Sequence, residues 1–160
     1  MMAYNIITAP LWPAYTDAYA KKDFIWMRGV RTKMTRILFL SVIGCAFLVI
    51  LSNDIYKIWI GEEIEIPFIM TMLVSIYVTI YCWVMLNGTI IVGIGKVKLN
   101  TYIVVLGMIT HIPLSLYLGT LFGSYGVLLS MIFINIMYGI VYNAQTNKLL
   151  NNTATGIWNQ

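Results

Sequence analysis

Long uncharged blocks alternate with short charged segments along the chain. The longest block, residues 99–147, contains no Asp, Glu, Lys or Arg. A helix that crosses a bilayer needs roughly 20 apolar residues at about 1.5 Å of rise per residue. This block is therefore long enough for two crossings, and the glycines at 119–126 favour a turn between them.

The hydrophobic pattern of the whole chain predicts four complete crossings, at about 36–53, 67–90, 100–119 and 125–145. Residues 1–16 are apolar but too short for a full crossing. They are expected to be the end of a helix whose beginning is missing, and an interfacial segment is the alternative. The sequence thus predicts an all-α, polytopic transmembrane helical bundle with an N-terminal partial crossing. Residues 151–160 are expected to be a disordered polar tail.

The segment 17–36 holds six of the ten basic residues. Asp23 is well placed to cap the start of a helix there. An apolar stripe on that helix follows from the three- and four-residue spacing of Phe24, Met27, Val30 and Met34. A stripe flanked by Lys and Arg indicates an amphipathic helix that lies in the membrane interface. A solvated linker is the alternative.

The distribution of Lys and Arg predicts the topology. If 17–36 is cytoplasmic, the successive connections hold six, one, two, zero and one basic residues. Nine of the ten are then on the cytoplasmic side, as the positive-inside rule requires. The C-terminus is cytoplasmic in this arrangement. The loop at 53–65 lies on the other side, is net acidic, and carries the interfacial aromatics Tyr56 and Trp59.

Composition supports a membrane protein. The chain is 60% hydrophobic and 10% charged, with a mean hydropathy of +0.82, whereas soluble domains carry about 25% charged residues. The net charge of +4 does not indicate nucleic-acid binding, because the basic residues flank the apolar blocks. Cys45 and Cys82 both lie inside apolar blocks, where they are expected to be small core residues rather than a disulfide or a metal pair.

Residues for catalysis are scarce. His111 is the single histidine, and every carboxylate lies outside the predicted crossings. A neutral imidazole that hydrogen-bonds a neighbouring helix is the favoured interpretation. A membrane-embedded transferase would need a carboxylate or a metal beside His111, which the chain does not visibly provide. We expect no enzyme activity, no cofactor and no metal site.

Uncharged polar residues within the crossings are the remaining candidates for function. They include Asn87, Asn100, Asn135, Asn143 and Gln145, together with several tyrosines. Amides at membrane depth can join helices or line a hydrated cavity. Both interpretations stay open, because amides and phenols also offer hydrogen bonds to sugars without a fixed charge.

Several short motifs together resemble a known family. The string Pro-Leu-Trp-Pro-Ala-Tyr-Thr-Asp-Ala-Tyr at 10–19 precedes Lys-Asp-Phe-Ile-Trp at 22–26 and a basic helix. Ile-Trp-Ile-Gly at 58–61, Asn-Gly at 87–88 and Gly-Ile-Gly-Lys at 93–96 follow in the same order, and Gly119, Gly123 and Gly126 separate the last two crossings. This arrangement resembles the bacterial O-antigen/polysaccharide flippases of the multidrug/oligosaccharidyl-lipid/polysaccharide exporter superfamily.

The resemblance implies a protein of two lobes in the bacterial inner membrane. It implies alternating-access movement of an undecaprenyl-diphosphate-linked oligosaccharide, with polysaccharide polymerase machinery as a further partner. The chain would supply crossings nine to twelve and the tail of the eighth. The N-terminal lobe would be missing, so transport by the chain alone is not expected.

The resemblance also suggests roles for individual residues. Pro10, Pro13 and Asp17 are candidates for a hinge at the cytoplasmic end, and Asn87, His111 and Asn135 are candidates for the substrate path. The alternative function is a small four-helix membrane scaffold that acts by protein–protein binding, which the glycine-rich crossings would serve equally well.

Overall fold

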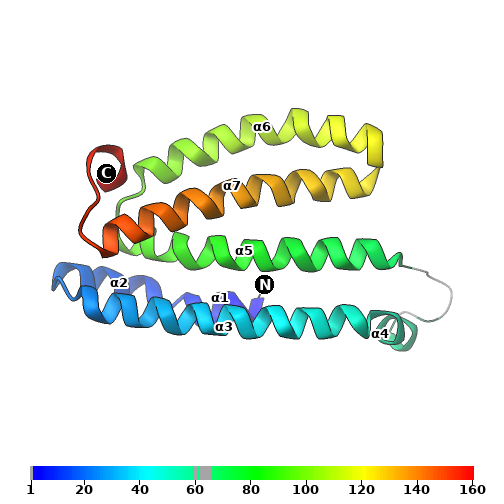
Figure 1. The fold of residues 1–160 in the computed structure, drawn as a ribbon, viewed down its shortest axis with the longest axis horizontal. Coiled ribbons are helices and arrows are strands. Elements are labelled where there is room, and N and C mark those ends of the chain that lie inside the picture. Colours follow the sequence, from blue (N-terminus) through cyan, green and yellow to red (C-terminus); the bar gives the residue numbers. More distant parts are fainter. Residues whose placement is uncertain (1, 60, 62–65) are drawn as a thin grey trace.

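The computed structural model describes residues 2–59, 61 and 66–160, and its regular elements there are all helices (Figure 1). Four helices are long and apolar enough to cross a membrane: α3 (Phe24–Ile50), α5 (Phe68–Ile94), α6 (Lys98–Phe122) and α7 (Ser124–Leu150). A helix of 27 residues is about 40 Å long, which exceeds the roughly 30 Å hydrocarbon core of a bilayer. The prediction of an all-α polytopic bundle is confirmed.

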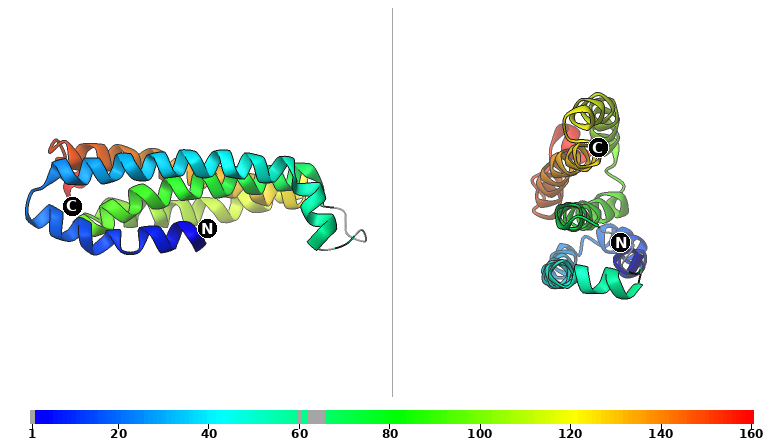
Figure 2. Two further views of the ribbon diagram at one scale, coloured as in Figure 1. Left: turned by 90° about the horizontal axis from the view of Figure 1, so that it is seen from below. Right: turned by 90° about the vertical axis from the view of Figure 1, so that its right-hand side faces the viewer.

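Shorter helices complete the fold: α1 (Met2–Thr8), α2 (Leu11–Ala20), α4 (Ser52–Trp59) and the 3-10 helix η1 (Gly156–Asn159). The end-on view in Figure 2 shows α5 in the middle of the bundle. There α7 lies on one side of α5, and α1, α2 and α3 lie on the other. The fourth long helix, α6, packs along α7.

The predicted interfacial helix at 17–36 is not a separate element. Residues 24–36 of this segment are the start of α3, which continues without a break into the first crossing. Met27 and Met34 of the apolar stripe are buried in the protein core. The prediction was wrong because a three- and four-residue spacing reports one buried helix face without saying whether lipid or protein covers it.

Asp23 caps α3 as expected, since its carboxylate accepts a hydrogen bond from the backbone N–H of Trp26 at 2.9 Å. This bond satisfies one of the free N–H groups in the first helical turn.

Replacing Asp23 with alanine is therefore expected to lower the free energy of unfolding by about 1 kcal/mol. Equilibrium unfolding of the purified chain in mixed micelles, followed by circular dichroism, measures the change. The control is Asp23→Asn, which keeps a side-chain acceptor and should match the unmodified chain. Equal losses in both variants would contradict a capping role.

The predicted loop at 53–65 begins as a helix. In Figure 2, α4 turns away from the bundle axis at the end of α3. Its Ile58 and Trp59 are 87% and 85% exposed, as in an amphipathic helix that lies in a membrane interface. This helix lies at the end of the bundle opposite α2 (Figure 1). Ile60 and the acidic residues at 62–65 lie outside the described residues.

The expected partial crossing consists of α1 and α2, which are separated at Ala9 and Pro10. The second of these helices packs tightly on α5. Thr16 donates its hydroxyl proton to the carbonyl oxygen of Gly93 at 2.7 Å. A Cβ atom at Gly93 would lie 2.7 Å from the Cβ of Tyr15, so this close approach requires glycine.

The last two crossings form a tight hairpin that turns at Gly123, whose φ is +60°. Gly126 lies in the first turn of α7, and a Cβ atom there would overlap the carbonyl group of Leu118. Gly126 therefore allows the close packing of α7 on α6. Further along the same helix, a Cβ atom at Gly139 would overlap the ring of Trp83 on α5.

The C-terminal tail differs from the expected disordered segment. It forms η1 and folds back over the end of the bundle (Figure 1). Lys98 donates from its Nζ to the side-chain Oε1 of Gln160 at 2.7 Å. The Nζ of Lys148 lies 3.8 Å from the centre of the Trp158 ring, a cation–π contact. A single tryptophan and a terminal amide supply these contacts, which the polar composition of the tail does not reveal.

Candidate functional site

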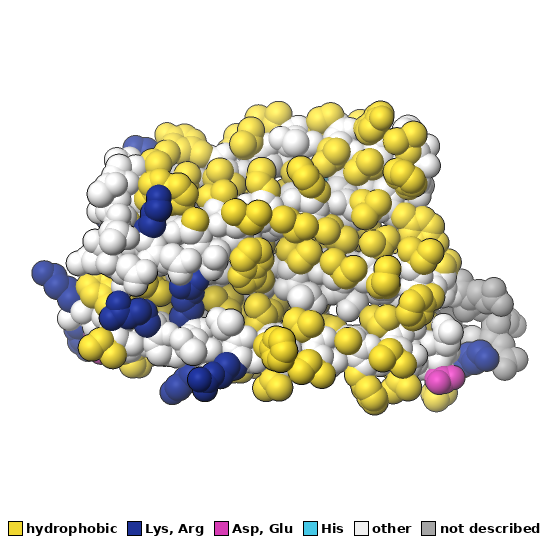
Figure 3. Space-filling view, viewed as in Figure 1, with side chains coloured by type: hydrophobic (Ala, Val, Ile, Leu, Met, Phe, Trp, Pro, Cys, Tyr) yellow, Lys and Arg dark blue, Asp and Glu magenta, His cyan; other side chains and the backbone are white. Residues whose placement is uncertain are grey.

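The basic residues gather at one end of the bundle. Figure 3 shows Lys and Arg side chains concentrated at the end where α2, the start of α3 and the end of α7 lie. Lys57 on α4 is at the opposite end. This separation agrees with the predicted nine-to-one division of basic residues. It gives the bundle one cationic end and one end that is nearly free of basic residues among the described parts.

Within the cationic end, one guanidinium group joins three helices. Arg31 on α3 donates from Nη1 to the Oδ1 of Asn147 at 2.5 Å and from Nη2 to the Oδ1 of Asn143 at 2.6 Å, both on α7. Its Nη2 also lies 3.3 Å from the Oδ1 of Asn87 on α5. We call these four residues the Arg31 cluster.

Helix geometry explains how this cluster forms. Arg31 lies four residues after Met27 and three before Met34, so it shares their buried face of α3. Asn143 and Asn147 are one turn apart on α7, which places both amides on the same face. Since α5 packs against both α3 and α7, the guanidinium reaches from α3 past Asn87 to α7.

Asn87 is held in place by its own helix. It is 1% exposed, and its Nδ2 donates to the carbonyl oxygen of Trp83 at 3.0 Å. Its backbone carbonyl oxygen lies 3.5 Å from the hydroxyl of Thr146 on α7. The amide oxygen is therefore fixed toward Arg31.

Among the described residues, no carboxylate forms an ion pair with Arg31. Across the described ranges, the one ion pair joins Lys21 to Asp17 at 2.7 Å on the surface. The acceptors of Arg31 are three neutral amides. Guanidinium groups bind carboxylates and phosphates more strongly than neutral acceptors, through charge-assisted paired hydrogen bonds. The cluster can therefore exchange an amide oxygen for an anionic group.

A second arginine interacts with the same end of α7. The Nη1 of Arg28 donates to the carbonyl oxygen of Leu150 at 3.2 Å. Leu150 is the last residue of α7, where free carbonyl groups and the helix dipole favour a cation. Arg28 therefore helps to fix the start of α3 against the end of α7.

His111 and Asn135 form hydrogen bonds with residues outside the Arg31 cluster. The Nε2 of His111 lies 3.3 Å from the hydroxyl oxygen of Ser130 on α7. That hydroxyl donates its one proton to the carbonyl oxygen of Val127 at 2.7 Å, so the ring nitrogen must be the donor to Ser130. Asn135 donates to the carbonyl oxygen of Met131 on its own helix at 2.9 Å.

The three substrate-path candidates therefore do not form one site. His111 links α6 to α7, as in the interpretation of a histidine bonded to a neighbouring helix. Asn135 precedes Asn143 by eight residues, or about 12 Å along α7. Only Asn87 of the three belongs to the Arg31 cluster.

The hinge candidates lie near the cationic end but outside the Arg31 cluster. Pro10 precedes α2 as its N-cap residue, and Pro13 is the third residue of that helix, where no backbone N–H is needed. Asp17 forms the surface ion pair with Lys21. The contact of α2 with α5 at Gly93 fixes the end of this segment.

Gln145 acts as a structural link. It is fully buried, and its Nε2 donates to the carbonyl oxygen of Lys96 at 2.9 Å. A longer bond of 3.4 Å reaches the carbonyl oxygen of Trp158. This amide therefore joins α7 to the connection between α5 and α6 and to the C-terminal tail.

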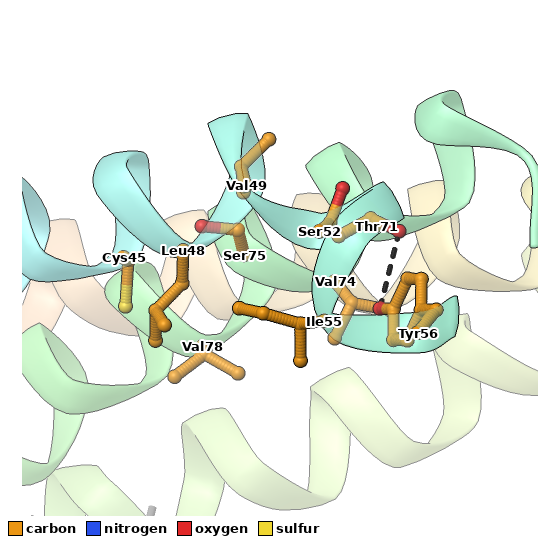
Figure 4. Close-up of a pocket in the computed structure, with 10 residues that line it drawn as sticks. All are labelled: Cys45, Leu48, Val49, Ser52, Ile55, Tyr56, Thr71, Val74, Ser75 and Val78. Atoms are coloured by element: carbon orange, nitrogen blue, oxygen red, sulfur yellow. Dashed lines mark hydrogen bonds between the residues drawn. The ribbon is translucent and has the colours of Figure 1, made fainter. Parts of the chain in front are cut away.

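A cavity of about 270 Å³ lies at the far end of the bundle, between α3, α4 and α5 (Figure 4). The hydroxyls of Tyr56 on α4 and Thr71 on α5 are 3.3 Å apart at its edge. The remaining walls are mostly aliphatic. None of the residues that the sequence suggested for function lines this cavity, and the Tyr56–Thr71 contact serves to hold α4 on α5.

The sequence analysis missed Arg31, which it assigned to the basic flank of an interfacial helix. A signal was present, because Arg31 interrupts the spacing of Met27 and Met34 on their own face. A charged residue within a buried stripe needs polar partners inside the protein. Asn143 and Asn147, one turn apart near the end of the last crossing, were suitable partners.

Fold and site together define a polytopic helical membrane protein with a guanidinium held between three crossing helices. The parts of the chain that the structure describes hold no group of three or more His, Cys, Asp or Glu side chains that could bind a metal ion. No protein-family model, no curated protein and no solved structure matches the chain.

Proposed function

We propose that the chain takes part in moving a lipid-linked oligosaccharide across a bacterial inner membrane, as the C-terminal part of a larger flippase. The observation that supports this most is the Arg31 cluster, a partly buried cation between three helices whose hydrogen-bond partners among the described residues are neutral amides. A diphosphate-linked sugar needs one group for its charge and others for its hydroxyls. The guanidinium suits the first, and the surrounding amides suit the second.

Translocation follows from an exchange of partners at this site. An anionic headgroup that approaches Arg31 competes with Asn143 and Asn147 for the guanidinium N–H groups. Since these amides are on α7 and Arg31 is on α3, the exchange loosens one link between the two helices. The binding energy of the headgroup thereby favours a changed helix arrangement. No covalent bond forms or breaks, so the function is not enzymatic.

The proposal includes an orientation and partners. The cationic end of the bundle faces the cytoplasm, in keeping with the positive-inside rule. An N-terminal lobe would supply the opposite wall of the substrate path, and polymerase machinery would receive the product. The competing function, a four-helix scaffold, makes the opposite prediction for the Arg31 cluster, because changes there would leave export unaffected.

The test is the double variant Asn87→Ala/Asn143→Ala, introduced at the chromosomal locus of the chain. Surface polysaccharide is expected to fall several-fold at an unchanged level of the chain, because Arg31 keeps only Asn147 as an ordered partner. Immunoblotting of surface polysaccharide and of the membrane fraction measures both quantities.

The matched control is His111→Gln, which alters another part-buried polar contact outside the cluster and keeps a donor for Ser130. Polysaccharide is expected to stay at the level of the unmodified strain. Normal polysaccharide in the Asn87/Asn143 variant, with the chain at its usual level, would overturn the assignment of the site and favour the scaffold function.

A further inference from the structure

A second cavity, of about 500 Å³, is lined by none of the four residues of the Arg31 cluster. Its walls come from the junction of α1 and α2, from α5, from the start of α6 and from α7. Its volume is within the range of roughly 300–1,000 Å³ that is typical of small-molecule sites. None of the residues proposed above for substrate movement lines it.

Helix packing explains why this space is open. The crossing helix α6 packs along α7, and within the described residues its backbone does not come close to that of α5 or α2. A gap therefore remains beside α5, and α1 and α2 cover it only in part. Trp12 and Val104 of its lining are 55% and 45% exposed, so the cavity opens at the side of the bundle.

The walls are apolar and extend along the direction of the crossing helices. On α5 the lining runs from Val84 to Val92, which corresponds to about 12 Å. The hydroxyl of Thr89 is bonded to the carbonyl oxygen of Met85 at 2.8 Å, so its methyl group is free to contact a ligand. A narrow, lengthwise, apolar space that opens toward the bilayer matches the shape and chemistry of an alkyl chain.

Two lysines lie in the chain next to the end of the cavity at the start of α6. Lys96 and Lys98 lie in the sequence between the lining segments of α5 and α6. The partner of Lys98 is the neutral side chain of Gln160. The Oδ1 of Asn100, in the cavity wall, is buried without a hydrogen-bond partner. An occupant that brings a negative charge and a hydroxyl group would complement all three side chains.

We propose that this cavity binds one acyl chain of an anionic phospholipid, whose phosphate lies beside Lys96 and Lys98. The site is independent of the proposed transport function, since no residue of the Arg31 cluster lines the cavity. The lipid fills the gap between α2 and α6 and fixes the cationic end of the bundle at the depth of the headgroups. Its tail is held by apolar contact and its headgroup by charge.

Native mass spectrometry of the purified chain tests the proposal. The chain is mixed with equal amounts of phosphatidylglycerol and phosphatidylcholine that carry the same acyl chains, and with undecaprenyl phosphate. One phosphatidylglycerol is expected to be retained in preference to the other two lipids. Gly88→Leu should reduce its retention by about tenfold, because the new side chain occupies the space of an alkyl segment.

Gly88 suits this test because a Cβ atom there would have only ordinary contacts, 3.7 Å from the ring of Tyr142. The matched control is Gly44→Leu on α3, where a Cβ atom would meet nothing within 4 Å. It should retain phosphatidylglycerol like the unmodified chain. Val104→Trp fills the same cavity from α6, and it decides the outcome if Gly88→Leu does not fold.

The headgroup contact has its own test. Lys96→Gln/Lys98→Gln should remove the preference for phosphatidylglycerol over phosphatidylcholine, whereas Lys33→Gln on α3 should not. Equal retention of the two phospholipids by the unmodified chain would overturn the proposal. The proposal would also be overturned if folded Gly88→Leu and Val104→Trp retained phosphatidylglycerol like the unmodified chain. A loss in Gly44→Leu as large as in Gly88→Leu would overturn it as well. If the chain instead retained undecaprenyl phosphate in preference, the cavity would be assigned to an isoprenoid lipid. This result would equally overturn the proposal.

Discussion

Replacing Arg31 with glutamine is expected to lower surface polysaccharide by about tenfold or more, since hydrogen bonds to charged groups contribute about 1.5–3 kcal/mol. The substitution keeps a polar side chain of moderate length but removes the positive charge. Asn143 and Asn147 can still accept hydrogen bonds from the new amide, so the fold should persist. What is lost is the attraction for an anionic headgroup. Quantitative immunoblotting of surface polysaccharide in a strain that carries the variant measures the effect.

Two variants separate charge from geometry. Arg31→Lys keeps the charge but loses the paired donors of the guanidinium, so its polysaccharide level should lie between those of the glutamine variant and the unmodified chain. Lys33→Gln removes a charge from an exposed position on the same helix and should have no effect. Full export by Arg31→Gln, with the chain present at its usual level, would exclude Arg31 from the substrate path.

Gly126→Ala is expected to destabilise the bundle strongly, although it adds a single methyl group. The added Cβ atom would overlap the carbonyl oxygen and carbon of Leu118 and lie 2.8 Å from the backbone nitrogen of Gly119. Overpacking usually costs about 1–3 kcal/mol. A side chain could rotate to relieve the overlap, but these backbone atoms cannot. We therefore expect a loss of about 3 kcal/mol or more in the free energy of unfolding.

The matched control is Gly119→Ala, on the other arm of the same hairpin. A Cβ atom at that position would lie 3.7 Å from the Cγ2 of Val127, an ordinary contact. Alanine also favours a helix over glycine, so this variant should be as stable as the unmodified chain or slightly more stable. Denaturant titration in mixed micelles gives both values. Equal stability of the two variants would disprove the close contact of α6 with α7.

The crossings could be predicted because a bilayer sets the length of an apolar helix. The block at 99–147 could hold only two crossings, and the glycines near 123 marked the turn. Boundaries were less exact, since α3 begins at Phe24 rather than near 36. The apolar block begins after the basic residues, but the helix already includes them. Long cationic side chains can reach the headgroups from within a helix, so they need not end it.

The site could be predicted only in part. Asn87 was recognisable as an amide within a crossing. Its role, however, depends on Arg31, which is 56 positions away in the sequence. The contacts of Arg31 with Asn143 and Asn147 span 112 and 116 positions. No periodicity in a single sequence encodes such pairs. They follow from α5 lying between α3 and α7, which is a property of the packed bundle.

The decisive measurement is the leaflet in which lipid-linked oligosaccharide accumulates after deletion of the locus that encodes the chain. A lectin specific for the sugar is added to intact spheroplasts and, separately, to lysed ones. If the chain takes part in translocation, the oligosaccharide accumulates in the cytoplasmic leaflet, and the lectin binds only after lysis. Binding of the lectin to intact spheroplasts at the level of the parent strain would contradict the proposed function.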